Sequence, residues 1–98
     1  MNIVVPEDEI SAFCRRHGIR RLALFGSVLR EDFRPDSDVD VLVEFEPGVR
    51  VGWAFIDLQD ELSRILGREV DLNTPGFLSR HMRQRVLDTA EVIYERER

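Results

Sequence analysis

Three aspartates are spaced so that their carboxylates could act together. Asp38 and Asp40 lie two residues apart in a valine-rich segment, and on a strand their side chains would face the same side. Asp71 lies between Val70 and Leu72, where a charged side chain is unfavourable on propensity and burial grounds. If the two segments are neighbouring strands, the three carboxylates converge and repel one another unless a divalent cation lies among them. Hard oxygen donors suit Mg²⁺, so the pattern predicts a metal site.

A Gly-Ser pair upstream offers a second kind of chemistry. Gly26 and Ser27 follow an apolar segment and precede a short predicted helix. A glycine there lets the backbone approach a ligand closely, and the start of the helix would present unpaired N–H groups to an anion. The Ser27 hydroxyl could add a phosphate contact. The alternative for this pair is a tight turn with a helix cap, and for the acids it is solvent-exposed side chains on strand edges.

Helices and strands are expected in a regular order that would position these residues. Glycine and proline divide the chain into segments, within which apolar residues recur at helical spacing or form short valine-rich or apolar runs. The predicted helices cover residues 6–17, a short segment from Ser27, 53–66 and 78–90. The predicted strands cover 19–25, 39–45 and 69–73, and 91–95 is either a fourth strand or the frayed end of the last helix.

The order of these elements predicts an α+β fold in which a mixed β-sheet is packed with helices. The connection between the first two strands is too short for a helical crossover, so an antiparallel step is expected there. Helices between strands favour a sheet whose faces are mostly covered. Residues 1–98 are expected to form a single domain, because two independent cores would need more chain.

Composition and charge restrict the possible partners. The net charge is −5, from 14 basic and 19 acidic residues, which argues against non-specific nucleic-acid binding. The one cysteine, Cys14, excludes an internal disulfide framework and a Cys-based zinc site. No apolar run is long enough for a membrane span, so a cytoplasmic protein is expected. A chain of 98 residues has little material for a large pocket, so a partner or a second copy should supply part of the site.

The spacing of the glycine, serine and acids closely resembles the nucleotidyltransferase superfamily typified by DNA polymerase beta. The motif of that family is Gly-Ser, about ten residues, and then Asp-x-Asp on a strand, with a third Asp on a later strand. Here ten residues, 28–37, separate Gly26-Ser27 from Asp38-Val39-Asp40. The segment Val70-Asp71-Leu72 is similar to the one that carries the third acid. The implied fold is the polymerase beta-like nucleotidyltransferase fold.

The finer resemblance is to the minimal nucleotidyltransferase (MNT) proteins. In these, Gly-Ser leads into an arginine and an acidic turn before Ser-Asp-x-Asp, and Arg30 and Ser37 hold the corresponding places. Leu29 and Glu31 depart from the alanine and glycine that the family often has beside the arginine. Glu31 adds negative charge near the phosphate site, which would weaken nucleotide affinity.

The resemblance implies a nucleotide transfer that depends on two Mg²⁺ ions. Family members bind a nucleoside triphosphate, here expected to be ATP, and transfer the nucleoside monophosphate to a hydroxyl with release of pyrophosphate. Asp38 and Asp40 would hold both ions, and Asp71 would complete the site of the ion beside the attacking hydroxyl. The residues implied in nucleotide binding are Gly26, Ser27, Arg30 and Ser37. Arg30 could contact a phosphate or the protein acceptor, and a solvated turn arginine is an equally good alternative to either contact.

The resemblance also implies a partner protein. MNT proteins of this size resemble the antitoxin of a toxin–antitoxin pair whose toxin is a HEPN-family ribonuclease, and some add AMP to a tyrosine of that toxin. A competing hypothesis is a binding module, weak or inactive in catalysis, that neutralises the toxin by masking it; small size, Glu31 and the lack of an evident general base favour it. Modification of an RNA end or a small molecule is a weaker third hypothesis, because the chain is acidic and has no second domain.

Three arginines in the last predicted helix could be functional. Arg80, Arg83 and Arg85 could contact a triphosphate or an acidic partner surface. The favoured alternative is a solvent-exposed face opposite the apolar residues Leu78, Met82 and Val86.

Four other side chains are assigned structural roles. Trp53 is expected to cover the core from the start of its helix, although an exposed tryptophan could anchor a partner. Cys14 lies on an apolar stripe and is expected to be buried and unreactive. His17 and His81 are expected on helix surfaces rather than in a catalytic role.

Overall fold

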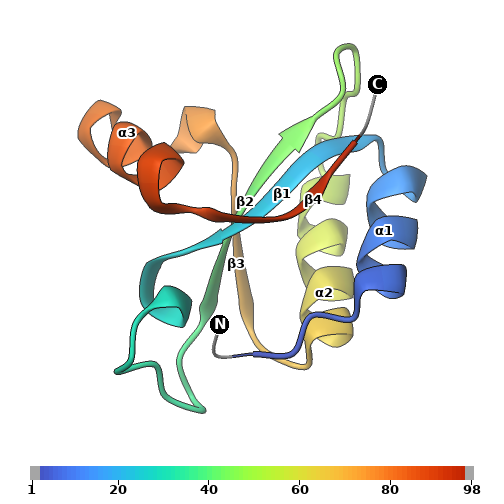
Figure 1. Cartoon of the computed structure of the whole chain (residues 1–98). Coiled ribbons are helices and arrows are strands. Elements are labelled where there is room, and N and C mark those ends of the chain that lie inside the picture. The colour runs from blue at the N-terminus through green and yellow to red at the C-terminus, as the bar shows by residue number, and fades with distance from the viewer. Residues whose placement is uncertain (1–2, 97–98) are drawn as a thin grey trace.

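A mixed four-stranded sheet forms the centre of the protein (Figure 1). The computed structural model describes residues 3–96. The α-helices are α1 (Glu7–Arg16), α2 (Ala54–Leu66) and α3 (Arg80–Thr89), and two short 3₁₀ turns are η1 (Gly26–Leu29) and η2 (Pro75–Phe77). The strands are β1 (Ile19–Phe25), β2 (Val39–Phe45), β3 (Val70–Asn73) and β4 (Glu91–Glu95).

The sheet has the strand order β3-β2-β1-β4. Strand β1 is antiparallel to both β2 and β4, whereas β2 and β3 are parallel. Helix α2 makes the connection that a parallel pair requires. The α+β class, the mixed sheet and the antiparallel first step are thereby confirmed. The open alternative for residues 91–95 is decided as well, because they pair with β1 as a strand.

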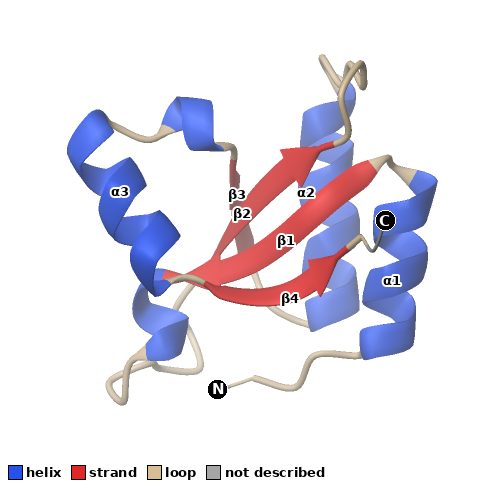
Figure 2. Ribbon diagram, turned by 45° about the horizontal axis from the view of Figure 1, so that its top comes forward, coloured by secondary structure: helices blue, strands red, loops and turns tan. Residues whose placement is uncertain are grey.

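Helices α1 and α2 cover one face of the sheet (Figure 2). Their apolar stripes supply Ile10 and Phe13 from α1 and Leu62 from α2, all of them buried. Strand β2 contributes alternate residues to the same core, since residues two apart on a strand face the same side. The residues concerned are Val39, Val41 and Val43.

Helix α3 lies on the opposite face, where a smaller core holds it in place (Figure 1). This core joins Leu78 and Val86 to Ala23, Phe25 and Leu42 of the sheet. Because Asp40 alternates with the valines of β2, it faces this side of the sheet together with Leu42. The sheet therefore presents its acidic residues toward the side that α3 covers only in part.

Two predictions of burial were wrong. Met82 was expected inside the last helix's packing face, but it is 52% exposed. Trp53 was expected to cover the core, but it is 91% exposed because α2 begins only at Ala54 and Trp53 precedes its first turn. Cys14 is fully buried, as expected.

The ends of the three α-helices lie within two residues of the ends predicted from the sequence. Helix α2 ends at Leu66, and Gly67 follows in a left-handed conformation with φ 66°. This sharp end lets the chain enter β3 and brings Asp71 onto the sheet beside β2. None of the helices in residues 3–96 has the length and apolar character needed to cross a bilayer.

Candidate active site

Asp40 and Asp71 occupy paired positions on neighbouring strands. In the parallel register of β2 and β3, the Cα atom of Asp40 is the partner of that of Asp71. Adjacent strands lie about 4.8 Å apart, so the two side chains start close together on the same face. Asp38 immediately precedes β2 and is exposed. The strand adjacency on which the three-acid prediction depended is therefore present.

The charge state of Asp40 reflects these neighbours. Partial burial raises the pKa of its carboxyl, and the negative charges of Asp71 and Asp38 raise it further, whereas the Arg30 guanidinium acts in the opposite direction. Like charges disfavour ionisation because each added negative charge is repelled by those present. All three acids thus contribute to one electrostatic site, with Arg30 at its edge.

The Gly26 backbone lies directly against the Asp40 carboxylate. Phe25, the last residue of β1, pairs with Asp40 across the antiparallel ladder, and Gly26 follows with φ 75°. A Cβ atom at position 26 would overlap Asp40 Oδ2 and would lie 3.2 Å from Asp40 Cγ. A side chain at this position would therefore displace the carboxylate, so the turn requires glycine for both its conformation and its close approach.

The Gly-Ser turn differs from its prediction in one respect. The short helix expected from Ser27 is a single 3₁₀ turn of four residues, in which the Arg30 N–H donates to the Ser27 carbonyl at 2.9 Å. The macrodipole of a helix comes from many aligned peptides, so one turn supplies little of it. The anion-binding capacity of this turn must come from the Gly26 and Ser27 backbone, the Ser27 hydroxyl and nearby arginines.

A pocket of about 370 Å³ opens between this turn and α3. Gly26 and Asp40 line it on the sheet side, and Arg30 lines it at the end of η1. The remaining walls combine apolar side chains with a second arginine and a threonine: Phe25, Leu29, Met82, Arg85, Val86 and Thr89. An apolar pocket with a few converging polar groups is the usual form of a small-ligand site, and this volume falls in the usual range.

The remaining predicted residues lie around a second, more polar cleft. Ser37 and Asp38 line a cleft of about 550 Å³ together with residues of the loop before β3. The Ser37 hydroxyl accepts a hydrogen bond from the Arg34 backbone N–H at 3.2 Å and closes the loop that leads to β2. The structure thus brings Gly26, Arg30 and Asp40 together in one pocket and places Ser37 and Asp38 beside it, whereas Ser27 and Asp71 line neither cavity.

The donor set fits a hard cation in its chemistry but is not gathered around one point. Within residues 3–96, no group of three or more His, Cys, Asp or Glu side chains is arranged to hold a metal ion. Asp38, Asp40 and Asp71 nevertheless supply only carboxylate oxygens, the donors that Mg²⁺ prefers. A cation held by these three carboxylates would remove the repulsion that raises the pKa of Asp40.

Comparison with known proteins decides the family. Residues 8–93 match the model of the nucleotidyltransferase domain family, described as "Nucleotidyltransferase domain". This chain belongs to the nucleotidyltransferase domain family. A relative in Thermococcus cleftensis, the protein adenylyltransferase MntA, is 39% identical over 79 residues, which cover 81% of this chain and 77% of that protein.

Solved structures place this nucleotidyltransferase among the minimal ones. A structure described as a minimal nucleotidyltransferase has a TM-score of 0.70 and 37% identity, and covers 86% of this chain and 85% of that one. The fold also matches one chain of a complex, which is described as tri-AMPylated Shewanella oneidensis HEPN toxin with MNT antitoxin. That match has a TM-score of 0.64 and 23% identity, with 92% and 70% of the two chains covered. The resemblance to MNT proteins and the nucleotidyltransferase activity class are confirmed.

Arg68 holds the loop that carries Ser37 and Asp38 in this nucleotidyltransferase. Its Nη1 donates to the backbone carbonyls of Pro35 at 2.6 Å and Arg34 at 3.2 Å. The Arg68 guanidinium carbon also lies 4.6 Å from the centroid of the Phe33 ring. Sequence reasoning missed this residue, because its partners lie more than thirty positions away and no spacing signals the contact.

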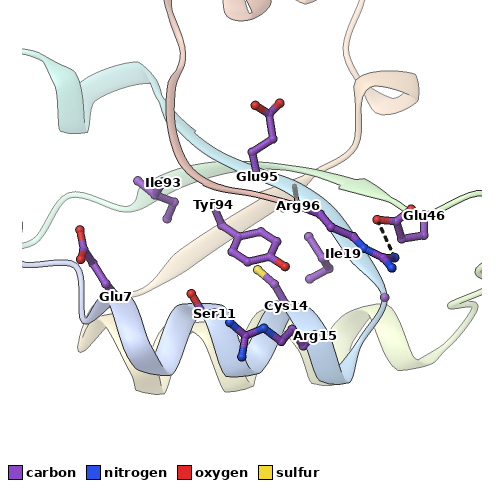
Figure 3. Close-up of a pocket in the computed structure, with 11 residues that line it drawn as sticks. Glu7, Ser11, Cys14, Arg15, Ile19, Glu46, Ile93, Tyr94, Glu95 and Arg96 are labelled. Carbon is purple, nitrogen blue, oxygen red and sulfur yellow. Dashed lines mark ion pairs between the residues drawn. The ribbon is translucent and has the colours of Figure 1, made fainter. Parts of the chain in front are cut away.

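The largest of the described pockets lies elsewhere and is a poorer candidate. It has a volume of about 720 Å³ and lies between helix α1 and the part of the sheet formed by β1 and the edge strand β4 (Figure 3). Burial raises the pKa of the Cys14 thiol in its floor to about 12, so this sulfur is a weak nucleophile at neutral pH. Arg96 and Glu46 at its rim pair with each other at 3.3 Å.

The two histidines do not join the acidic site. His17 Nε2 lies 3.0 Å from Glu61 Oε1, and its ring packs edge-on against Phe13 at 4.9 Å between centroids. His17 is therefore half-buried on the helix-covered face, a structural position. His81 is exposed on α3 and lines neither cavity of the site.

Proposed function

We propose that this nucleotidyltransferase transfers AMP from ATP to a hydroxyl group of a partner protein, with Mg²⁺ held by Asp38, Asp40 and Asp71. The observation that carries the proposal is the position of Asp40, which lies between the Gly26 backbone on one side and its register partner Asp71 on the other. A carboxylate with a raised pKa at the junction of two like charges is a group that a cation would stabilise.

Each residue would have a separate task in the transfer. Gly26 and Ser27 would bind the outer phosphates through backbone N–H groups and the Ser27 hydroxyl, which fixes the α-phosphate in line with the attacking oxygen. Arg30, which already acts on Asp40, would neutralise phosphate charge. Ser37 would contact the nucleotide from the loop that Arg68 holds.

The three aspartates would hold the two Mg²⁺ ions, one beside the acceptor hydroxyl and one beside the pyrophosphate. Asp38 and Asp40 would bind both Mg²⁺ ions, and Asp71, which is exposed, would complete the site on the side where the acceptor hydroxyl enters. Bound Mg²⁺ lowers the pKa of an attacking hydroxyl and neutralises charge that develops on the departing pyrophosphate. The acceptor oxygen bonds to the α-phosphorus as the bond to the bridging oxygen breaks, and the hydroxyl proton passes to water.

The acceptor that we propose is a HEPN-family toxin, so that the protein is the antitoxin of the pair. Two comparisons support this: the Thermococcus cleftensis relative is named a protein adenylyltransferase, and the Shewanella oneidensis structure pairs an AMPylated HEPN toxin with an MNT antitoxin. The cytoplasmic location, the number of Mg²⁺ ions and any homo-oligomer stay predictions.

A second function, neutralisation by masking alone, is favoured by one observation. Large apolar side chains are exposed beside the start of α2, with Trp53 91%, Phe77 69% and Ile56 57% exposed. Such side chains are typical anchors of protein interfaces. In this alternative the chain would bind the toxin and leave it unmodified.

Transfer of label from α-³²P-ATP tests the proposal. The chain is expressed together with the protein encoded by the adjacent gene, and label on that protein is measured with Mg²⁺ present. The parent is expected to label it, and the double variant Asp38→Asn/Asp40→Asn is expected to lose labelling. Labelling that survives in the double variant would refute the enzymatic proposal. If the double variant still protects cells and the parent transfers no label, masking is the function.

A further inference from the structure

The structure separates the three arginines of α3, which the sequence could treat only as a group. Arg83 is held by the protein itself: its Nε donates to the Pro75 carbonyl at 2.8 Å and its Nη2 to the Leu78 carbonyl at 3.2 Å. Arg80 is exposed and does not line the nucleotide pocket. Arg85 lines that pocket together with Gly26 and Asp40. Of the three arginines, only Arg85 is therefore placed to take part in the transfer.

Arg85 lies on the side of α3 that borders the pocket. The pocket-lining residues of this helix are Met82, Arg85, Val86 and Thr89, which follow one another at i, i+3, i+4 and i+7. This spacing defines one side of a helix, and on a helix that packs against a sheet it is normally apolar. Val86 fulfils that expectation and is buried. The other three residues are exposed, so this side of the helix borders the open pocket, where a charged side chain can reach a bound ligand.

The Arg85 guanidinium makes no hydrogen bond or ion pair within residues 3–96. The backbone of Arg85 is engaged, because its carbonyl accepts from Thr89 Oγ1 at 2.8 Å. By contrast, the guanidinium groups of Arg68 and Arg83 each donate to backbone carbonyls of the protein. The five donors of Arg85 are therefore available to a ligand in the pocket.

The charges at the site call for a cation in this position. A nucleoside triphosphate brought to three aspartates adds several negative charges, and two divalent ions do not neutralise all of them. Arg30 approaches from the η1 side of the pocket, and Arg85 approaches from the opposite wall on α3. A planar guanidinium matches two phosphate oxygens at once, which makes arginine well suited to this ligand.

We propose that Arg85 binds the phosphate groups of the nucleotide and, with Arg30, encloses them between α3 and the Gly26-Ser27 turn. This inference rests on the proposed function, since it takes the 370 Å³ pocket as the nucleotide site. It assigns to α3 a direct part in substrate binding, beyond covering the sheet. The affinity that Arg85 adds must scale with the number of phosphates and must be absent for the nucleoside alone.

Ligands that differ in phosphate number test this directly. Binding of α,β-methylene-ATP, AMP and adenosine, each with Mg²⁺, is measured by NMR titration and calorimetry for the parent, Arg85→Ala, Arg85→Lys and the matched helix variant Arg80→Ala. Arg85→Ala is expected to raise the dissociation constant of the triphosphate analogue about 10- to 100-fold. It should leave adenosine binding unchanged, with Arg85→Lys intermediate. Arg80→Ala should bind within about twofold of the parent.

The other outcomes have definite meanings. If Arg85→Ala weakened binding of the triphosphate analogue and of adenosine equally, the inference would be overturned. Arg85 would then contact the nucleoside or maintain the shape of the pocket. Parent-like binding of the triphosphate analogue by Arg85→Ala would overturn it as well. Failure of the parent itself to bind the analogue would contradict the proposed function. Since the Arg85 side chain is exposed and only its backbone carbonyl is hydrogen-bonded within the described residues, the Arg85 variants should melt at the parent temperature.

Discussion

Asp40 and Asp71 are register partners across the parallel β2–β3 ladder, and the Gly26 backbone lies against the first of them. Asp40 is therefore partly enclosed between a neighbouring acid and a turn whose backbone approaches it closely. The raised pKa of Asp40 follows from this enclosure. The arrangement sacrifices stability in the free protein for a site that a cation and a nucleotide can occupy.

Replacement of Asp40 by asparagine should stabilise the protein while it abolishes transfer. Asparagine keeps the shape of the side chain but removes a charge that burial and two neighbouring acids disfavour. At pH 7 the melting temperature of Asp40→Asn should exceed that of the parent, and transfer should fall at least about 100-fold. Calorimetry and the labelling assay measure the two effects.

The stabilisation should depend on pH in a defined direction. Because the folded pKa of Asp40 lies above its usual value, the native state holds this proton more tightly than the unfolded state does. The stability that Asp40 contributes is fully present below about pH 3.9, the ordinary aspartate pKa, and is lost as the pH rises through the raised value. The advantage of Asp40→Asn should grow over that interval. A constant difference from pH 3 to pH 8 would contradict the assignment.

Replacement of Gly26 by alanine should damage both the fold and the site. A left-handed conformation costs a non-glycine residue about 1–2 kcal/mol, and the added Cβ would also displace the Asp40 carboxylate. Gly48→Ala is the matched control, because Gly48 has φ 87° with no atom within 4 Å of the added Cβ. Both variants should lose stability, but only Gly26→Ala should lose transfer. Equal transfer by the two would mean that the contact with Asp40 is unimportant.

Replacement of Arg68 by alanine should loosen the loop before β2. It removes two hydrogen bonds to the Arg34 and Pro35 carbonyls and the contact with the Phe33 ring. Hydrogen exchange of the backbone at 33–38 should accelerate, and transfer should fall about 10-fold, the lower range for loss of a residue that orients metal ligands. Arg64→Ala, an exposed change on α2, is the control. Unchanged exchange in Arg68→Ala would show that the loop is held by other contacts.

Mg²⁺ should stabilise the free protein through the acids. A ligand that binds only the native state stabilises it by an amount that rises with the logarithm of ligand concentration above the dissociation constant, and a cation would relieve the repulsion around Asp40. Millimolar MgCl₂ should therefore raise the melting temperature of the parent more than NaCl of equal ionic strength does. The effect should be absent in Asp38→Asn/Asp40→Asn. EDTA should stop transfer and leave the chain folded.

Much of the site could be predicted because it depends on local patterns. Side chains alternate between the two faces along β2, so Asp40 was expected to face away from Val39 and Val41. A charged residue between Val70 and Leu72 marked the neighbouring strand. The order of elements and the antiparallel step followed from the length of the connections.

The remaining features depend on contacts that no local pattern encodes. The exact pairing of Asp40 with Asp71 is a register between distant segments. Arg68 acts on a loop more than thirty residues away, and the separate roles of Arg83 and Arg85 depend on where α3 lies over the sheet. Exposure of Trp53 was missed because burial at the start of a helix depends on what lies beside it.

The measurement that bears most directly on the account compares nucleotide binding with transfer in Asp71→Asn. Asp71 is exposed and lines neither cavity of the site, so its role depends wholly on its pairing with Asp40. The variant should bind α,β-methylene-ATP within about threefold of the parent, while label transfer from ATP to the partner protein falls at least about 100-fold. Transfer at the parental rate would contradict the three-acid site.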